Sequence, residues 1–315
     1  MNIITNISKS RSFLMGIAIL AILLFHQEFV HGNCVLEFFN HYGHWCVQVF
    51  ILVSGFGIWY ALDKPGTVKS FYMRRLWRIM PASILGGVLA LALTLETSIA
   101  QNLLLITGLS LWYIRTILML YLISPLLYAL FKSAKRALWY VVLMVVAYVM
   151  YHAASHTMEY WWMGSWKLRQ TVIWTLGQVP FYVSGMYLAA ERGKIWKSAI
   201  LVVIGCCLLP VLFQLSFGNS SIGTEFVHNA SVLLICAFGY YPYAVFPKSV
   251  NRVIDWCGEH SLELYVCHEA IYAFSYNLDK SVYMLPVALV ASFLAAYGIS
   301  VASRSIVKLC KSSKV

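Results

Sequence analysis

Long apolar stretches are the feature that most constrains what this chain can fold into. Of its 315 residues, 61% are hydrophobic and only 11% are charged, whereas soluble domains carry about 25% charged residues. A helix that crosses a bilayer needs roughly 20 mostly apolar residues, and about ten such stretches follow one another along the chain. We therefore predict an all-α integral membrane protein with about ten transmembrane helices. The stretches are Phe13–Val30, Trp45–Leu62, Ile79–Leu95, Leu111–Phe131, Ala137–Tyr151, Thr171–Ala190, Ser198–Phe217, Ala230–Phe246, Ser261–Tyr276 and Val282–Ser303.

Positive charge falls mainly on one side of the predicted membrane. When the N-terminus is placed in the cytoplasm, nearly all of the 23 Lys and Arg residues lie in segments on that same side. The opposite side holds only Lys167, Arg169 and Lys280, and Arg115 lies inside a predicted helix. This asymmetry follows the positive-inside rule. We therefore predict that both termini are cytoplasmic.

No soluble segment separates the apolar stretches, so residues 1–315 are predicted to form a single membrane-embedded domain. The short apolar stretch Ile99–Ser110 predicts a re-entrant or interfacial helix that leads into the next span. The net charge of +11 follows from membrane topology, and no nucleic-acid-binding module is recognisable. The expected surroundings are therefore the lipid bilayer, with no nucleic acid as a partner.

His26 lies in the second half of the first apolar stretch, Phe13–Val30. An ionisable side chain at membrane depth is costly, so it is a functional candidate by default. With a cytoplasmic N-terminus, His26 lies toward the outer leaflet, just beyond mid-depth. Imidazole is the usual general base near neutral pH, which makes His26 a candidate catalytic base. The alternative is a histidine that is hydrogen-bonded inside the bundle and carries no chemistry.

Three arginines, Arg74, Arg75 and Arg78, precede the third predicted span. Arg75 and Arg78 are three residues apart and therefore share one face of a helix. Guanidinium groups bind phosphate in a bidentate manner, so the cluster is a candidate phosphate site. The same residues would also serve as a simple topology anchor at the lipid headgroups.

Further charged residues lie inside predicted spans. Arg115 is one turn into the outer end of the fourth span, where it either extends outward to the headgroups or faces the interior of the bundle. Glu263, His268 and Glu269 share the span Ser261–Tyr276. Three ionisable groups in one helix are expensive unless they are paired inside the bundle, so they form either a structural cluster or part of a site.

The cysteine and histidine spacing does not indicate a metal site. The eight cysteines show no zinc-type spacing. His31, His41 and His44 lie close together in the first outer loop, but no carboxylate or cysteine spacing accompanies them. We expect no metal.

Six segments carry motifs in a fixed order along the chain. Residues 14–26 end in the embedded histidine, 50–56 contain Ser-Gly-Phe, 74–81 contain the arginines, 111–125 begin with Leu-Trp-Tyr, 179–185 begin with Val-Pro, and 261–268 end in a second histidine. Together these segments resemble the acyltransferase-3 family of multi-pass membrane acyltransferases. The resemblance covers nearly the whole chain.

This resemblance implies the transfer of an acyl group, most often acetyl, from cytoplasmic acyl-CoA to a hydroxyl of a cell-envelope glycan or lipid-linked sugar. His26 would be the base, and the arginines Arg74, Arg75 and Arg78 would bind the CoA phosphates. Arg115 would stabilise developing oxyanion charge. Acetyl-CoA is the expected donor and a glycan the expected acceptor.

Met15 is a departure from the family pattern. The family usually carries arginine eleven residues before the first-span histidine, on the same helix face, and this chain has Met15 there. Arg11, one turn earlier, or Arg115 would then supply the missing charge toward the donor. Two other interpretations stay open: a glycan exporter, because ionisable residues in spans also suit a transport pathway, and a catalytically inactive relative of the family.

Overall fold

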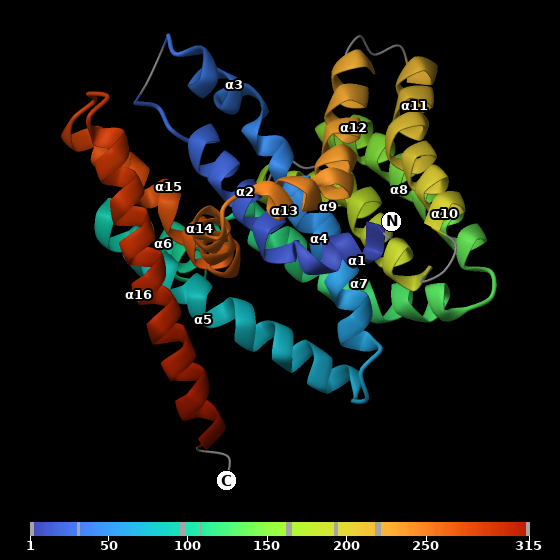
Figure 1. Ribbon diagram of the computed structural model, residues 1–315, viewed down its shortest axis with the longest axis horizontal. Helices are drawn as coiled ribbons and strands as arrows, with labels where there is room; N and C mark the ends of the chain where they lie inside the picture. Colours follow the sequence, from blue (N-terminus) through green and yellow to red (C-terminus); the bar gives the residue numbers. More distant parts are fainter. Residues whose placement is uncertain are drawn as a thin grey trace. The chain divides into compact units, whose positions relative to one another are not determined.

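The computed structural model describes residues 3–29, 32–94, 99–107, 109–161, 166–191, 195–217 and 222–312 (Figure 1). Helices account for all of the regular secondary structure in these residues, and no strand occurs among them. The prediction of an all-α protein is therefore confirmed.

The chain divides into two compact units, each built from three separate segments. Unit 1 comprises Met1–Leu14, Gln48–Phe71 and Arg115–Val245, and unit 2 comprises Met15–Val47, Tyr72–Ile114 and Phe246–Val315. The chain passes between the units five times, four times within a helix and once between Val245 and Phe246, so neither unit is a continuous piece of sequence. These four helices are α2 (Arg11–Phe25), α4 (Cys46–Leu62), α5 (Val68–Thr94) and α7 (Trp112–Lys132).

The other helices each lie within one unit. Unit 1 contains α1 (Ile3–Lys9), α8 (Arg136–Trp161), α9 (Trp166–Ala190), α10 (Ile195–Val203), the π-helical turn η2 (Ile204–Leu208), α11 (Leu209–Phe217), α12 (Ile222–Phe238) and α13 (Tyr240–Val245). Unit 2 contains α3 (Cys34–Tyr42), the 3₁₀ turn η1 (Gly43–Trp45), α6 (Ile99–Ile106), α14 (Lys248–Glu259), α15 (Ser261–Leu278) and α16 (Met284–Ser312).

All ten predicted apolar stretches overlap helices, and residues 30 and 95, each the last of its stretch, lie outside the described residues. The prediction that Phe13–Val30 forms one helix is wrong at its end, because α2 ends at Phe25 and residues 26–29 are not helical. In the described part of the chain, five helical segments are long and apolar enough to cross a membrane on their own. They support an integral membrane protein, while the number of ten spans and the cytoplasmic termini remain predictions. The five segments are Cys34–Leu62, Val68–Thr94, Trp112–Lys132, Arg136–Ser155 and Met284–Cys310.

The predicted stretch Ala230–Phe246 is not one helix in the structure. Helix α12 ends at Phe238, and α13 begins at Tyr240 after Gly239. Pro242 has no amide hydrogen to donate to the carbonyl of Phe238, so a continuous helix would lose a hydrogen bond there. The short stretch Ile99–Ser110 does form a short helix, α6.

Two glycines allow α4 and α9 of unit 1 to approach each other closely. A Cβ atom at Gly55 would collide with the backbone carbonyl of Tyr182, and one at Gly185 would collide with the carbonyl of Leu52. Each glycine thus lies against the backbone of the other helix. Small residues of this kind are the usual means of close helix packing in membranes, which explains the Ser-Gly-Phe motif in structural terms.

We predict that Gly55→Ala and Gly185→Ala each destabilise the protein by about 1–3 kcal/mol, because the added methyl group overpacks the contact between α4 and α9. The measurement is thermal unfolding of the purified protein in detergent. Gly298→Ala is the matched control, since a Cβ at Gly298 on α16 meets no atom within 4 Å. Equal melting temperatures for all three variants would contradict the predicted close packing.

Helix α15 makes extensive contacts in unit 2. It packs along α16 and also contacts α14. Gly86 brings α5 against α15, because a Cβ there would meet the side chain of Val266, and Gly16 brings α2 against the backbone of Ile254 on α14. Charged and polar residues on α15 can therefore find partners on neighbouring helices without contacting lipid.

Candidate active site

The candidate site begins at the C-terminal end of α2. His26 directly follows Phe25, the last residue of the helix, and its amide still donates to the carbonyl of Ile22 at 3.2 Å. The ring nitrogen Nδ1 lies 2.9 Å from the same carbonyl oxygen. The side chain of His26 is 27% exposed. Its ring is therefore held at one edge and accessible at the other.

Helix α15 brings two further ionisable side chains to His26. Nε2 of His268 lies 3.3 Å from Nδ1 of His26, and a carboxylate oxygen of Glu269 lies 3.3 Å from Nε2 of His26. His268 is completely buried, whereas the Glu269 side chain is 45% exposed. Each nitrogen of the His26 ring thus faces a different residue of α15.

A cavity of about 380 Å³ opens beside this group. His26 and Glu269 lie on its wall, so the accessible side of the imidazole faces a space large enough for a small substrate group. Polar and aromatic side chains make up most of the rest. The lining residues are His26, Glu28, Phe29, Glu269, Tyr272, Ala273, Tyr276 and Asn277.

Arg78, one of the predicted phosphate ligands, is already paired in the structure. Its NH1 lies 2.6 Å from a carboxylate oxygen of Glu263 on α15, and its NH2 donates to the carbonyl of Glu259 at 3.3 Å. The Glu263 side chain is 2% exposed and the Arg78 side chain 50% exposed. Arg78 therefore neutralises a buried carboxylate, and only its remaining N–H groups are available for a phosphate.

The other two arginines of the cluster lie on the same helix, α5. Arg74 is exposed and Arg75 is half-buried. Arg75 and Arg78 are three residues apart in a continuous helix, which confirms that they share a face. Binding of CoA phosphates by Arg74, Arg75 and Arg78 remains a prediction.

The remaining predicted cations belong to unit 1, whereas His26 belongs to unit 2. Arg11 is exposed at the start of α2, with its guanidinium beside Gly57 of α4. Arg115 is half-buried in the first turn of α7. Their proposed roles toward the donor and the oxyanion remain predictions. Met15 is half-buried in α2.

His26, His268 and Glu269 also form a group that could hold a metal ion, since one donor atom from each lies within 4.8 Å of the others. From the sequence, only His31, His41 and His44 came into question as metal ligands. His41 and His44 are exposed, and His31 lies outside the described residues. The local geometry does not suit a metal on Nδ1 of His26, because this nitrogen faces the carbonyl oxygen of Ile22 and must carry a hydrogen there.

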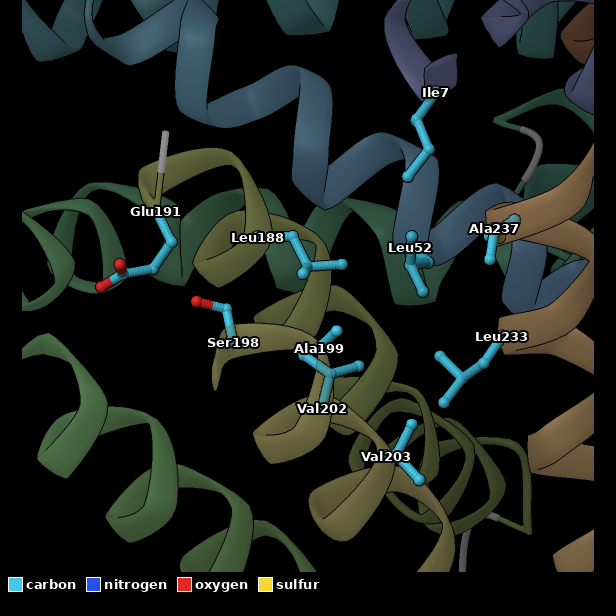
Figure 2. A pocket seen from close by; sticks show the side chains of 11 residues that line it. Ile7, Leu52, Leu188, Glu191, Ser198, Ala199, Val202, Val203, Leu233 and Ala237 are labelled. Atoms are coloured by element: carbon cyan, nitrogen blue, oxygen red, sulfur yellow. The ribbon is translucent and has the colours of Figure 1, made fainter. Parts of the chain in front are cut away.

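A second cavity, of about 90 Å³, lies in unit 1 and differs in character. Figure 2 shows aliphatic side chains such as Leu52, Leu188 and Val202 converging on it, while the carboxylate of Glu191 points away from them. Glu191 instead pairs with Arg136 at 3.4 Å. The side chains that point into this cavity are apolar, and no acid or base among the described residues is directed into it. The cavity beside His26 is therefore the better candidate for an active site.

The contact between His26 and α15 could not be derived from local pattern. The sequence presented His26 and the pair His268 and Glu269 as separate features, 242 residues apart for the two histidines. One signal in the sequence pointed to this contact: an ionisable side chain inside an apolar segment is costly unless it has a partner. His26, His268 and Glu269 each needed one. In the structure Glu263 pairs with Arg78, and His268 and Glu269 both contact His26.

A helical membrane protein in which a histidine and a carboxylate line one cavity belongs to a class suited to acid–base chemistry. The comparisons with known proteins agree with this class. The acyltransferase-3 family model, described as an acyltransferase domain, matches residues 13–304. The chain therefore belongs to the acyltransferase-3 family, and the resemblance noted in its motifs is confirmed. Curated proteins and solved structures gave no match.

Proposed function

We propose that this family member is an O-acetyltransferase that transfers the acyl group of cytoplasmic acetyl-CoA to a hydroxyl of a cell-envelope glycan or lipid-linked sugar. The observation that supports it is the His26 ring, which lies between Glu269 and His268 on the wall of a cavity lined by polar and aromatic side chains. A hydroxyl needs a base within hydrogen-bond reach to become a nucleophile. His26, on the cavity wall, would meet this requirement for a hydroxyl that is bound beside its ring.

The proposed reaction balances as a single acyl transfer. Nε2 of His26 takes the proton of the acceptor hydroxyl, and the oxygen attacks the thioester carbonyl of the donor. The carbon–sulfur bond then breaks, and the proton passes from His26 to the leaving thiolate, giving CoA and the ester. Glu269 stabilises the imidazolium between these steps, because its carboxylate lies 3.3 Å from the protonated nitrogen.

The donor would be held on the cytoplasmic side. Arg74 and Arg75, with the unengaged N–H groups of Arg78, would bind the CoA phosphates. Arg11 would assist at the donor, and Arg115 would stabilise charge on the carbonyl oxygen. The distribution of Lys and Arg supports cytoplasmic termini, and the protein would reside in a bacterial inner membrane, where cytoplasmic acetyl-CoA and a cell-envelope acceptor are both within reach.

The experiment that tests the function compares cell-envelope glycans of a deletion strain and its parent by mass spectrometry. Loss of an acetyl-sized mass from an otherwise intact glycan is the expected result. Loss of the whole glycan would instead indicate an exporter, and unchanged glycans together with no acetyl-CoA consumption by membranes would indicate an inactive relative. Restoring the gene on a plasmid controls for secondary changes in the deletion strain.

We predict that Met15→Arg is tolerated and that its acyl-transfer activity equals or exceeds that of the wild type. Residues 15 and 26 are eleven apart, so they share a helix face about 16 Å apart along the axis, and that face should already line a polar channel. Activity and the amount of folded protein after detergent extraction are the measurements.

Ile17→Arg is the matched control for Met15→Arg, because Ile17 is also half-buried in α2 but points to another face. An unpaired arginine in a span costs roughly 2.5–3.5 kcal/mol on insertion scales, so this control should lower the amount of folded protein. If Met15→Arg reduces folded protein as much as Ile17→Arg does, the polar-channel interpretation of this face is wrong.

A further inference from the structure

His268 is completely buried and lies behind the proposed base, on the side away from the cavity lining. Its ring nitrogen Nδ1 lies 2.9 Å from the carbonyl oxygen of Tyr265 and 3.2 Å from that of Leu264. Carbonyl oxygens only accept hydrogen bonds. Nδ1 of His268 must therefore carry the hydrogen.

This assignment determines the role of the other nitrogen of His268. In a neutral imidazole one nitrogen is a donor and the other an acceptor, so Nε2 of His268 presents a lone pair. That lone pair faces Nδ1 of His26 at 3.3 Å. Nδ1 of His26 also faces the carbonyl oxygen of Ile22 at 2.9 Å. With two acceptors on the same side, Nδ1 of His26 must carry a hydrogen.

The consequence appears on the cavity side of the His26 ring. When Nδ1 carries the hydrogen in the neutral ring, Nε2 is left with its lone pair. This nitrogen faces the cavity and lies 3.3 Å from a carboxylate oxygen of Glu269. Because a carboxylate oxygen only accepts hydrogen bonds, this contact holds a further proton, on Nε2 or on Glu269, and Nε2 is free to act as a base once that proton has left. The nitrogen that can accept a proton is thus directed to the place where an acceptor hydroxyl would enter.

We propose that His268 is a positioning residue, which holds His26 in the tautomer with hydrogen on Nδ1 and thereby keeps Nε2 available as the base for the acceptor hydroxyl. This inference rests on the proposed acyl transfer for its catalytic meaning, but the tautomer itself is a property of the resting protein. Hydrogen bonds that hold the second nitrogen of a working histidine commonly set its tautomer and orientation.

The chain offers a matched control for His268. His260 is also buried, and its Nδ1 lies 3.0 Å from the backbone carbonyl of Trp256, four residues earlier. Its ring stacks on Trp256 at 4.3 Å between centroids. His260 thus reproduces the burial and backbone contact of His268, on the helix boundary just before α15, and within the described part of the chain the contacts of its ring are to Trp256 and not to His26.

The first experiment reads the tautomer directly. The full-length protein, labelled with ¹⁵N-histidine and reconstituted in liposomes, is studied by solid-state NMR, and the His26 signals are assigned by their loss in His26→Gln. We expect hydrogen on Nδ1 of His26 in the wild type and in His260→Gln. In His268→Ala we expect a mixture of the two tautomers, since one acceptor of the Nδ1 hydrogen is removed.

The second experiment measures acyl transfer by the same proteins. In metal sites, removing the residue that hydrogen-bonds the second nitrogen of a ligand histidine lowers affinity or activity about 10- to 100-fold. We expect a similar decrease in kcat for His268→Ala, with little change in KM for acetyl-CoA. His268→Gln should restore most of the activity, because its amide oxygen can accept from Nδ1 of His26. His260→Gln should behave as the wild type.

Several outcomes would overturn the proposal. A wild-type His26 without hydrogen on Nδ1 would do so alone, even if His26 proves to be the base and even if His268→Ala does not fold. A tautomer unchanged in His268→Ala would do so too. The purified protein could also contain one equivalent of a divalent metal that is lost in His268→Gln. That result would show that His268 is a metal ligand and not a positioning residue. Absence of acyl transfer in the wild type would instead refute the proposed function and leave the NMR result intact.

Discussion

Replacing His26 with alanine is expected to abolish acyl transfer without loss of folded protein. General-base catalysis contributes typically 10²- to 10⁴-fold, so the residual rate should fall by about that factor. The fold should survive, because the ring lies after the last residue of α2 and is partly exposed. The measurement is release of free CoA from acetyl-CoA by membranes that contain the variant, with ester formation followed by mass spectrometry.

His41→Ala is the matched control for this experiment. His41 is an exposed histidine on α3 of the same unit and does not line the cavity. It should retain wild-type activity. Added imidazole provides a further check, since a cavity of about 380 Å³ can admit a small base and partly restore the rate of His26→Ala. Full activity of His26→Ala would remove His26 as the base.

Replacing Arg78 with glutamine is expected to lower stability as well as donor binding. Breaking a buried ion pair costs about 3–5 kcal/mol, whereas exposed pairs contribute less than about 1 kcal/mol. Here Glu263 is buried and Arg78 is half exposed, so we expect a loss of roughly 2 kcal/mol. The second carboxylate oxygen of Glu263 has no hydrogen-bond partner among the described residues, which leaves the whole group unpaired once Arg78 is removed.

A double-mutant cycle with Glu263→Gln separates the two roles of Arg78. If Arg78 serves only Glu263, the double variant should recover both stability and affinity for acetyl-CoA. If Arg78 also binds a CoA phosphate, affinity should stay about 10- to 150-fold lower, the equivalent of 1.5–3 kcal/mol for a lost charged hydrogen bond. Arg252→Gln, at an exposed position on α14, controls for the loss of a surface charge.

Much of the helical pattern could be predicted from local hydropathy. Apolar runs such as Leu111–Phe131 and Val282–Ser303 correspond to α7 and α16, because membrane-compatible helices satisfy their backbone hydrogen bonds within one segment. Breaks and short helices were harder to predict. The interruption at Gly239 depends on Pro242 and on packing, and α14 carries too many polar residues to register as an apolar run.

The candidate site was only partly predictable, for a related reason. His26 could be identified as a functional candidate from its own position, because an ionisable residue within an apolar run is unusual whatever its partner is. Its partners lie on α15, more than 240 residues later, and no periodicity connects positions so distant. The same holds for Arg78 and Glu263, 185 residues apart. The sequence offered Arg78 as either a phosphate ligand or a topology anchor, whereas its ion pair with Glu263 depends on the packing of α5 against α15, which local pattern does not reveal.

Helix α15 contacts both the proposed donor-binding residue Arg78 and the proposed base His26. Glu263, which contacts Arg78, and His268, which contacts His26, are five residues apart on one helix, a rise of only about 7.5 Å. A donor phosphate that draws Arg78 away from Glu263 would leave a buried charge that α15 must accommodate by shifting, and His268 would shift with it. Donor and acceptor sites would then be thermodynamically coupled, and by reciprocity each ligand would change the affinity of the other by the same factor.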